Sequence, residues 1–183
     1  ATDRTTVVVN AESFGTVTAI DKPSSTVLWQ VGHRGARGRA VGYFDEPDDA
    51  VPQPDGTVWV ADIRNCRLVH LSGIGAWLGT SGGNGCRHAP PTAWGEPNGA
   101  FSAPDGSLIV TEILGSWITW LNANGSLRWS VRTPTQYPSD GMPLPDGSVL
   151  LTDYSAPGAV LRIDRAGHVL WRYAPSGPQR LNH

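Results

Sequence analysis

The sequence lacks several features that define common classes of protein. No window of its 183 residues repeats apolar residues at helical spacing, so we expect almost no α-helix. It has no apolar stretch long enough to span a bilayer as a helix. The formal net charge is only −2, which gives no electrostatic reason to expect binding to nucleic acid or to an anionic membrane.

Motifs of widespread catalytic sites are also missing. The chain contains no His-Glu-x-x-His zinc motif and no phosphate-binding glycine loop. What it does contain is 22 Gly, 15 Pro and eight Trp, with 39% apolar residues. This composition supports a core and is typical of many short strands joined by frequent turns.

One pattern of residues recurs along the chain. Segments 46–62, 96–112 and 137–153 each carry small residues, a Pro-Asp-Gly turn, an apolar run and a terminal acid. Residues 2–10 repeat the second half of this pattern and end at Asn10. Each acid is followed by an alternating strand, a short turn and a strand that carries a Trp (Trp29, Trp77, Trp129 and Trp171).

Each repeat therefore predicts four antiparallel strands, the first of which lies innermost at 49–54, 99–104 and 140–145. Four-stranded repeats of roughly 40–50 residues are typical of β-propeller blades. We predict an all-β propeller with blades at about 1–46, 47–96, 97–137 and 138–183. The first blade lacks an inner strand, which gives fifteen strands and predicts an incomplete arc of a larger ring.

The repeats also resemble known families. The sequence Pro-Asp-Gly, an apolar strand ending in Val-Ala-Asp, and Asn-x-Arg at 61–67 resembles NHL-type propeller repeats. The segments Leu-Trp-Gln-Val-Gly and Leu-Trp-Arg-Tyr-Ala are similar to pyrroloquinoline-quinone-like and arylsulfotransferase-like propellers. The latter resemblance implies a catalytic His near the central channel, although no distinctive arylsulfotransferase motif is present. Such scaffolds host many activities.

The two cysteines, Cys66 and Cys86, fall in turn-rich segments of one repeat and on the same predicted face. We predict a disulfide, which indicates an oxidising compartment and hence a secreted, periplasmic or extracellular protein. The alternatives are two unpaired thiols or half of a metal site.

Strand order places the long segments 32–46 and 79–96 on one face of the propeller and the tight turns on the other. Binding residues concentrate on long loops held by rigid strands, so we assign function to this loop face. The candidates for catalysis are His88, Arg87, Arg64 and His183, because a histidine beside a cationic group can transfer a proton while Arg stabilises an oxyanion.

Polar residues at the starts of the inner strands are expected to ring the central channel. The ligand-binding candidates are Asp49, Asn98, Asp140, Trp94 and Tyr154. Of the acidic residues, Asp48, Asp49 and Asp140 are candidates for calcium, which prefers such oxygen ligands. The alternative, which we favour, is that these side chains cap strand starts, because every repeat carries them.

Three functions remain open. The chain is a module that binds a small molecule or a protein on its loop face. Alternatively it is a propeller enzyme, of the arylsulfotransferase-like or strictosidine-synthase/lactonase-like type. In the third interpretation it is a structural element whose ring is completed by further residues or by another chain.

Overall fold

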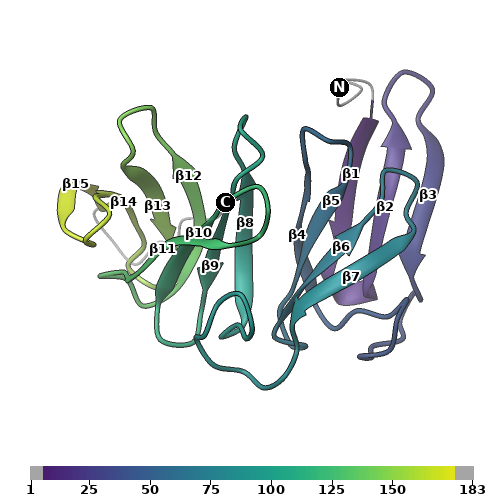
Figure 1. Cartoon of the computed structure of the whole chain (residues 1–183), viewed down its shortest axis with the longest axis horizontal. Coiled ribbons are helices and arrows are strands. Elements are labelled where there is room, and N and C mark those ends of the chain that lie inside the picture. Colours follow the sequence, from purple (N-terminus) through teal and green to yellow (C-terminus); the bar gives the residue numbers. More distant parts are fainter. Residues whose placement is uncertain (1–5, 176–183) are drawn as a thin grey trace.

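The computed structural model describes residues 6–175 as fifteen β-strands and one 3-10 helix of three residues. The strands form one three-stranded and three four-stranded antiparallel sheets, each running in sequence order (Figure 1). Within this part of the chain no helix is long and apolar enough to cross a membrane. The all-β prediction and the predicted strand count are confirmed.

The elements have the following bounds. The first sheet contains β1 (Thr6–Ala11), β2 (Thr16–Asp21) and β3 (Thr26–Gly32), with the 3-10 helix (Glu12–Phe14) between β1 and β2. The second contains β4 (Pro47–Pro52), β5 (Val58–Asp62), β6 (Arg67–Leu71) and β7 (Trp77–Gly82). The third contains β8 (Pro97–Ser102), β9 (Leu108–Glu112), β10 (Trp117–Leu121) and β11 (Leu127–Arg132). The fourth contains β12 (Pro138–Pro143), β13 (Val149–Asp153), β14 (Ala159–Ile163) and β15 (Val169–Tyr173).

The Pro-Asp-Gly turns form as their chemistry requires. The glycine has a positive φ, for example +87° at Gly56, which other residues rarely adopt. The preceding carboxylate accepts hydrogen bonds from the residue two positions on, as Asp55 Oδ1 does from the backbone N and Oγ1 of Thr57 (2.9 and 2.7 Å). The turns at 105–107 and 146–148 repeat this geometry.

The inner strands lie two residues earlier than predicted, at 47–52, 97–102 and 138–143. The register explains the shift. In each of these blades the pairing with the second strand is interrupted after the first residue, as between Pro47 and Ala50. The first proline of each inner strand thus pairs with the terminal acid of the second strand. The two residues that follow this proline lie in the interrupted part of the ladder.

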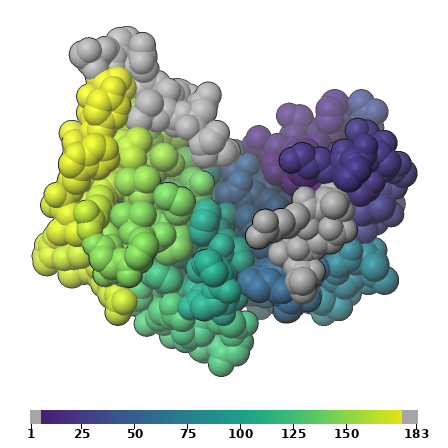
Figure 2. Space-filling model, turned by 90° about the horizontal axis from the view of Figure 1, so that it is seen from above, coloured from purple at the N-terminus to yellow at the C-terminus, as the bar shows by residue number. Residues whose placement is uncertain are grey.

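The four sheets pack face to face around a common axis. Their innermost strands follow one another in the order β1, β4, β8 and β12, and the first and last sheets lie at opposite ends of the molecule (Figure 2). A separate apolar cluster fills each of the three interfaces between sheets. These clusters centre on Phe44 and Val60, on Ala61 and Val110, and on Ile118 and Leu151.

The first blade begins at its second strand, as predicted. In the other blades the second strand packs against the inner strand of the next blade, as β5 does against β8 and β9 against β12. The β1 strand packs against β4 in the same way. Within residues 6–175, β1 therefore pairs with β2 alone and has no inner neighbour in its sheet.

Each outer strand carries its tryptophan as predicted, but the four do not take equivalent places in the register. The outer strands pair with the third strands through a β-bulge in every blade. Trp29, Trp129 and Trp171 take the same place before the bulge, opposite Ala19, Trp120 and Arg162. In the second blade Gly79 takes that place, opposite His70, whereas Trp77 pairs with Leu71 beyond the bulge.

The two faces of the arc differ as expected. In Figure 1 the tight turns that join β4–β5, β8–β9 and β12–β13 lie at the top, and the long β7–β8 connection lies at the bottom. We keep the names turn face and loop face for these two sides.

Large apolar side chains remain exposed on both outer sheets, including Val7 and Val9 (41% and 43%) and Leu170 and Trp171 (53% and 50%). We expect further blades or another chain to cover them, so the isolated chain should associate as its concentration rises. The double substitution Val9→Lys and Leu170→Lys should reduce this association in light-scattering measurements. A constant monomer mass at all concentrations, with strongly protected β1 amides in hydrogen exchange, would contradict the expectation.

Candidate functional site

A buried carboxylate at the end of each second strand holds the loop that leads into its blade. Asp62 Oδ1 accepts the backbone N–H of Asp45 (2.7 Å), and Glu112 Oε2 accepts that of Gly95 (2.6 Å). In the fourth blade Asp153 Oδ1 accepts that of Tyr137 (3.0 Å). Asn10 has the corresponding place in the first blade, and its amide donates to Pro47 O. These residues connect loops to strands.

Burial raises the pKa of Asp62 and of Glu112. Hydrogen bonds oppose this effect: the backbone N–H groups of Asp45 and Gly95 each lower the pKa of the carboxylate they contact. A carboxylate buried in this way is stable only while its partners remain in place.

In the second blade the same carboxylate organises the loop at 32–46 through Arg67. The guanidinium of this buried residue pairs with Asp62 (2.7 Å) and donates to the backbone oxygens of Arg39 and Tyr43 (both 2.7 Å). Asn65 adds a bond to Gly38 O (2.8 Å). The longest loop of the first blade is thus fixed by side chains of the second.

A chain of charged side chains lies on the loop face where the long loops meet the inner strands. Arg64 contacts Glu46 through Nε (2.8 Å) and Glu96 through Nη1 (2.9 Å), and so joins the second blade to the third. Arg37 contacts the other oxygen of Glu46 (2.8 Å) and Asp45 (3.2 Å). We call the set Arg37, Glu46, Arg64, Glu96 and Tyr137 the inner rim.

The rim carboxylates and guanidinium groups stabilise one another's charges. Burial alone would raise the pKa of Glu46, but the contacts with Arg37 and Arg64 bring it below its usual range. Burial alone would lower the pKa of Arg64, but Glu46 and Glu96 raise it. Because half of the Arg64 side chain is exposed, it can contact a ligand without leaving the rim.

Tyr137 takes the place in the third loop that Glu46 and Glu96 take in the others, directly before the inner-strand proline. Its hydroxyl donates to Asn98 Oδ1 (3.3 Å), and its ring contacts that of Tyr154 edge to face. Burial raises the pKa of Tyr137, and the carboxylates of Asp48, Glu12 and Glu96 raise it further. The charge of Arg64 acts in the opposite direction and lowers the pKa of Tyr137.

The predicted channel residues hold neighbouring blades together. Asp49 accepts the backbone N–H of Ala100 (2.8 Å), and Asn98 donates to Ser139 O (3.1 Å). Local capping, which we favoured from the sequence, is seen at Asp140, which accepts the N–H of Gly141 (2.7 Å). Among residues 6–175 no group of three or more His, Cys, Asp or Glu side chains is arranged to hold a metal ion.

His88 lies in a different network, between the 79–96 loop and the third blade. Its Nδ1 contacts Glu112 Oε1 (2.8 Å), and its Nε2 contacts Ser130 Oγ (3.2 Å). Trp117 stacks on the imidazole with ring centroids 3.8 Å apart. The order Ser130, His88, Glu112 is that of a nucleophile, a base and an acid, although Ser130 Oγ also contacts Ile118 O and Thr119 Oγ1.

Two further predicted site residues, Arg87 and Trp94, do not lie at the inner rim. Arg87 is exposed and donates to Asn84 O within its own loop (3.1 Å). Trp94 has no exposed surface, and its indole donates to Ser81 Oγ (3.0 Å). Trp94 thus packs in the core between the second and third blades. His183 lies outside the described residues.

Cys66 and Cys86 form the predicted disulfide, with Cα atoms 5.2 Å apart. The bond links the turn between β5 and β6 to the 79–96 loop, close to the segment that carries His88.

Sequence reasoning missed most of the inner rim. Glu46, Glu96 and Tyr137 begin the three repeated segments, but the sequence pattern gives them no role as site residues. Their shared place before a proline and their departure from the small residues around them were the available signals. Arg37 gave no signal, because its partner Glu46 lies nine residues away across an irregular loop.

Comparison by sequence finds no matching protein-family model and no matching curated protein. Solved structures do match. A streptogramin B lyase superposes with a TM-score of 0.68 at 16% identity, over 96% of this chain and 53% of that one. A catalytically inactive virginiamycin B lyase from Staphylococcus aureus with quinupristin gives 0.66 at 17%, over 97% and 55%. Hydrazine synthase of Kuenenia stuttgartiensis gives 0.70 at 17%, over 94% and 47%.

The matched proteins are β-propellers, which confirms that the chain folds as a propeller arc. The chain spans about half the length of these structures. At such identities the likeness concerns the fold alone, and the NHL and pyrroloquinoline-quinone-like resemblances stay predictions.

We expect His88→Ala to destabilise the protein by about 1–3 kcal/mol, because it removes a hydrogen-bond partner of buried Glu112. The control is His168→Ala, since His168 is exposed and pairs only with Asp164 at the surface. Urea unfolding measures both free energies. Equal stabilities of the two variants would contradict a structural role for the His88 network.

Removal of the disulfide by Cys66→Ser with Cys86→Ser should cost about 3 kcal/mol, the chain-entropy value for a loop of this size. The residues lie 20 apart in sequence. Thermal unfolding of the oxidised protein, the reduced protein and the double variant checks this. The reduced protein and the variant should behave alike, and an unchanged midpoint in both would be the contrary result.

Proposed function

We propose that this chain forms part of a propeller that binds a small molecule or a protein partner on its loop face, at the inner rim. The carrying observation is the Glu46–Arg64–Glu96 chain, in which a half-exposed guanidinium bridges two blades. A ligand that contacts Arg64 would act on both long loops, because Glu46 and Glu96 each belong to one of them. Tyr137, Tyr154 and Asn98 add a hydroxyl group, aromatic surface and an amide beside it.

The rim is prepared for recognition before any ligand arrives. Its carboxylates already hold Arg64 and Arg37 in fixed positions, so little side-chain freedom remains to be lost on binding. The loops behind it are held by Arg67, by the His88 network and by the disulfide. The disulfide also supports an extracytoplasmic location.

A catalytic role is the second candidate. Its support is the Ser130–His88–Glu112 arrangement, together with the likeness in fold to lyases. In this proposal His88 Nε2 accepts a proton from Ser130, and Glu112 stabilises the imidazolium that forms. A fluorophosphonate probe, which labels activated serines, should then modify Ser130 in the parent protein but not in His88→Ala. Absence of labelling under native conditions would exclude it.

The binding proposal predicts that Arg64→Gln weakens ligands found on the loop face by roughly tenfold, the effect of losing one charged hydrogen bond. Polar metabolites can be screened by thermal shift and mapped by hydrogen exchange. Arg128→Gln is the matched control, because Arg128 pairs with Asp105 on the turn face. Ligands that protect only turn-face amides, or that bind both variants alike, would refute the assignment.

A further inference from the structure

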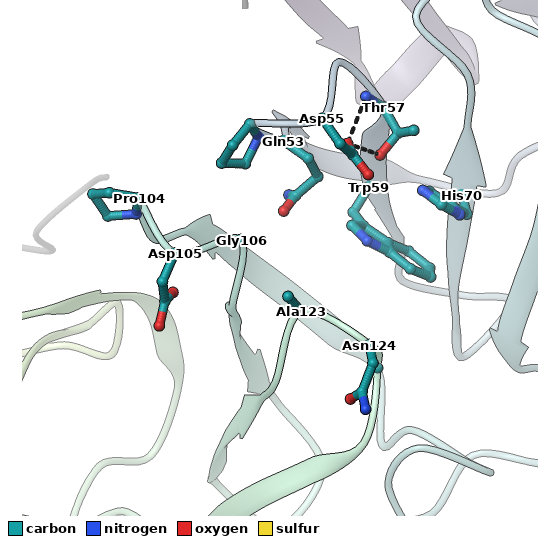
Figure 3. A pocket seen from close by; sticks show the side chains of 12 residues that line it. Gln53, Asp55, Thr57, Trp59, His70, Pro104, Asp105, Gly106, Ala123 and Asn124 are labelled. Carbon is teal, nitrogen blue, oxygen red and sulfur yellow. Dashed lines mark hydrogen bonds between the residues drawn. The ribbon is translucent and has the colours of Figure 1, made fainter. Parts of the chain in front are cut away.

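A hollow on the turn face, far from the inner rim, opens between the second and third blades. A cavity of about 500 Å³ lies there, bounded by the turn at 53–57, by the stacked rings of Trp59 and His70, and by the turns at 104–106 and 123–125 (Figure 3). A second hollow beside it shares Trp59 and Gly125. This volume lies within the range of small-molecule sites.

The hollow exists because the second blade breaks a packing rule that its neighbours obey. In the first blade Trp29 stacks against the turn of the next blade: a Cβ atom on Gly75 would lie 2.8 Å from its ring. Trp129 has the same place in the outer strand of the third blade and packs against the cluster that the third and fourth blades share. The second blade has Gly79 at this place.

Open space remains where that indole would lie. Gly125 is the third blade's counterpart of Gly75, since each donates its N–H to the residue three positions before it. A Cβ atom on Gly125 would meet nothing within 4 Å, and the same is true of Gly79. The space next to both glycines is therefore open, and we call it the vacant slot.

The walls also specify polar chemistry. Trp29 donates its indole N–H to Gly73 O (2.9 Å) in its own interface, and the matching carbonyl of the third blade belongs to Ala123. Asp55 uses a single oxygen, Oδ1, for both bonds to Thr57, and in Figure 3 its other oxygen lies on the side of Trp59. No Lys or Arg lines the cavity, so the walls favour a cation over an anion.

We propose that this slot binds a planar aromatic amine. The aromatic ring takes the place of the missing indole and stacks beside Trp59, and a ring N–H donates to Ala123 O. The ammonium group lies against Asp55, and a nearby tryptophan face adds to its stabilisation. The site is independent of the inner rim, from which it is separated by the length of the blades.

Tryptamine is the test ligand, because it joins an indole to an ammonium group, and tryptophol is its neutral counterpart. Calorimetry should show saturable binding of tryptamine at millimolar concentration and weaker binding of tryptophol, by roughly fivefold. Gly79→Trp restores the packing rule, fills the slot and should abolish binding while raising the thermal midpoint. Gly79→Ala leaves the slot open and should retain binding.

A charge variant keeps the test decisive if Gly79→Trp does not fold. Asp55→Asn preserves the acceptor for Thr57 and should weaken tryptamine by roughly fivefold, the effect of one partly exposed charge. Asp146→Asn makes the same change in the equivalent turn of the fourth blade and should have no effect. Equal affinity of tryptamine and tryptophol, equal binding to Asp55→Asn and Asp146→Asn, or no saturable tryptamine binding would overturn the proposal.

Discussion

The structure depends on the hydrogen bond from a loop N–H to the buried carboxylate at the end of the second strand. The acid lies at the inner end of a loop that must return from the outer edge of one blade to the centre of the next. Without it the backbone would enter the inner strand with an unpaired donor in a dry environment. Asp62, Glu112 and Asp153 each supply the acceptor. The connection carries a cost, because burial alone would favour the protonated acid.

Different side chains offset the cost of burying the carboxylate in the second and third blades, and they determine which residues the loop places at the inner rim. Arg67 fixes the loop at 32–46 and so positions Glu46. His88 performs the same task for the loop that carries Glu96. Arg64 then meets two carboxylates that were placed independently by two blades. The inner rim is a consequence of loop anchoring, and its charges are held before any ligand is present.

Most of the scaffold could be predicted from the sequence, because it repeats. Pro-Asp-Gly turns, apolar runs and terminal acids give strand order, face and blade count, and two cysteines on one face give the disulfide. The register could not be predicted in this way. The outer strands carry the same β-bulge in every blade, but Trp77 stands two residues nearer to its turn glycine than Trp129 and Trp171 do, so Gly79 takes the place of the tryptophans. The partners of Arg64 were equally hidden, since they lie 18 and 32 residues away across irregular loops.

The repeat also explains where chemistry can reside. A position that all blades share must satisfy the same packing and hydrogen bonding in each, so its residue is committed to the scaffold. Where one blade has a different residue at such a position, that residue no longer serves the shared packing, provided that a neighbouring residue supports the altered surface. Tyr137 departs from the glutamates at the rim and brings a phenol that donates to Asn98. Gly79 departs from the tryptophans on the turn face and leaves open space beside it. Beside Gly79 the interface between the second and third blades remains filled by Ala61 and Val110, so the open space at the turn face leaves most of that cluster intact.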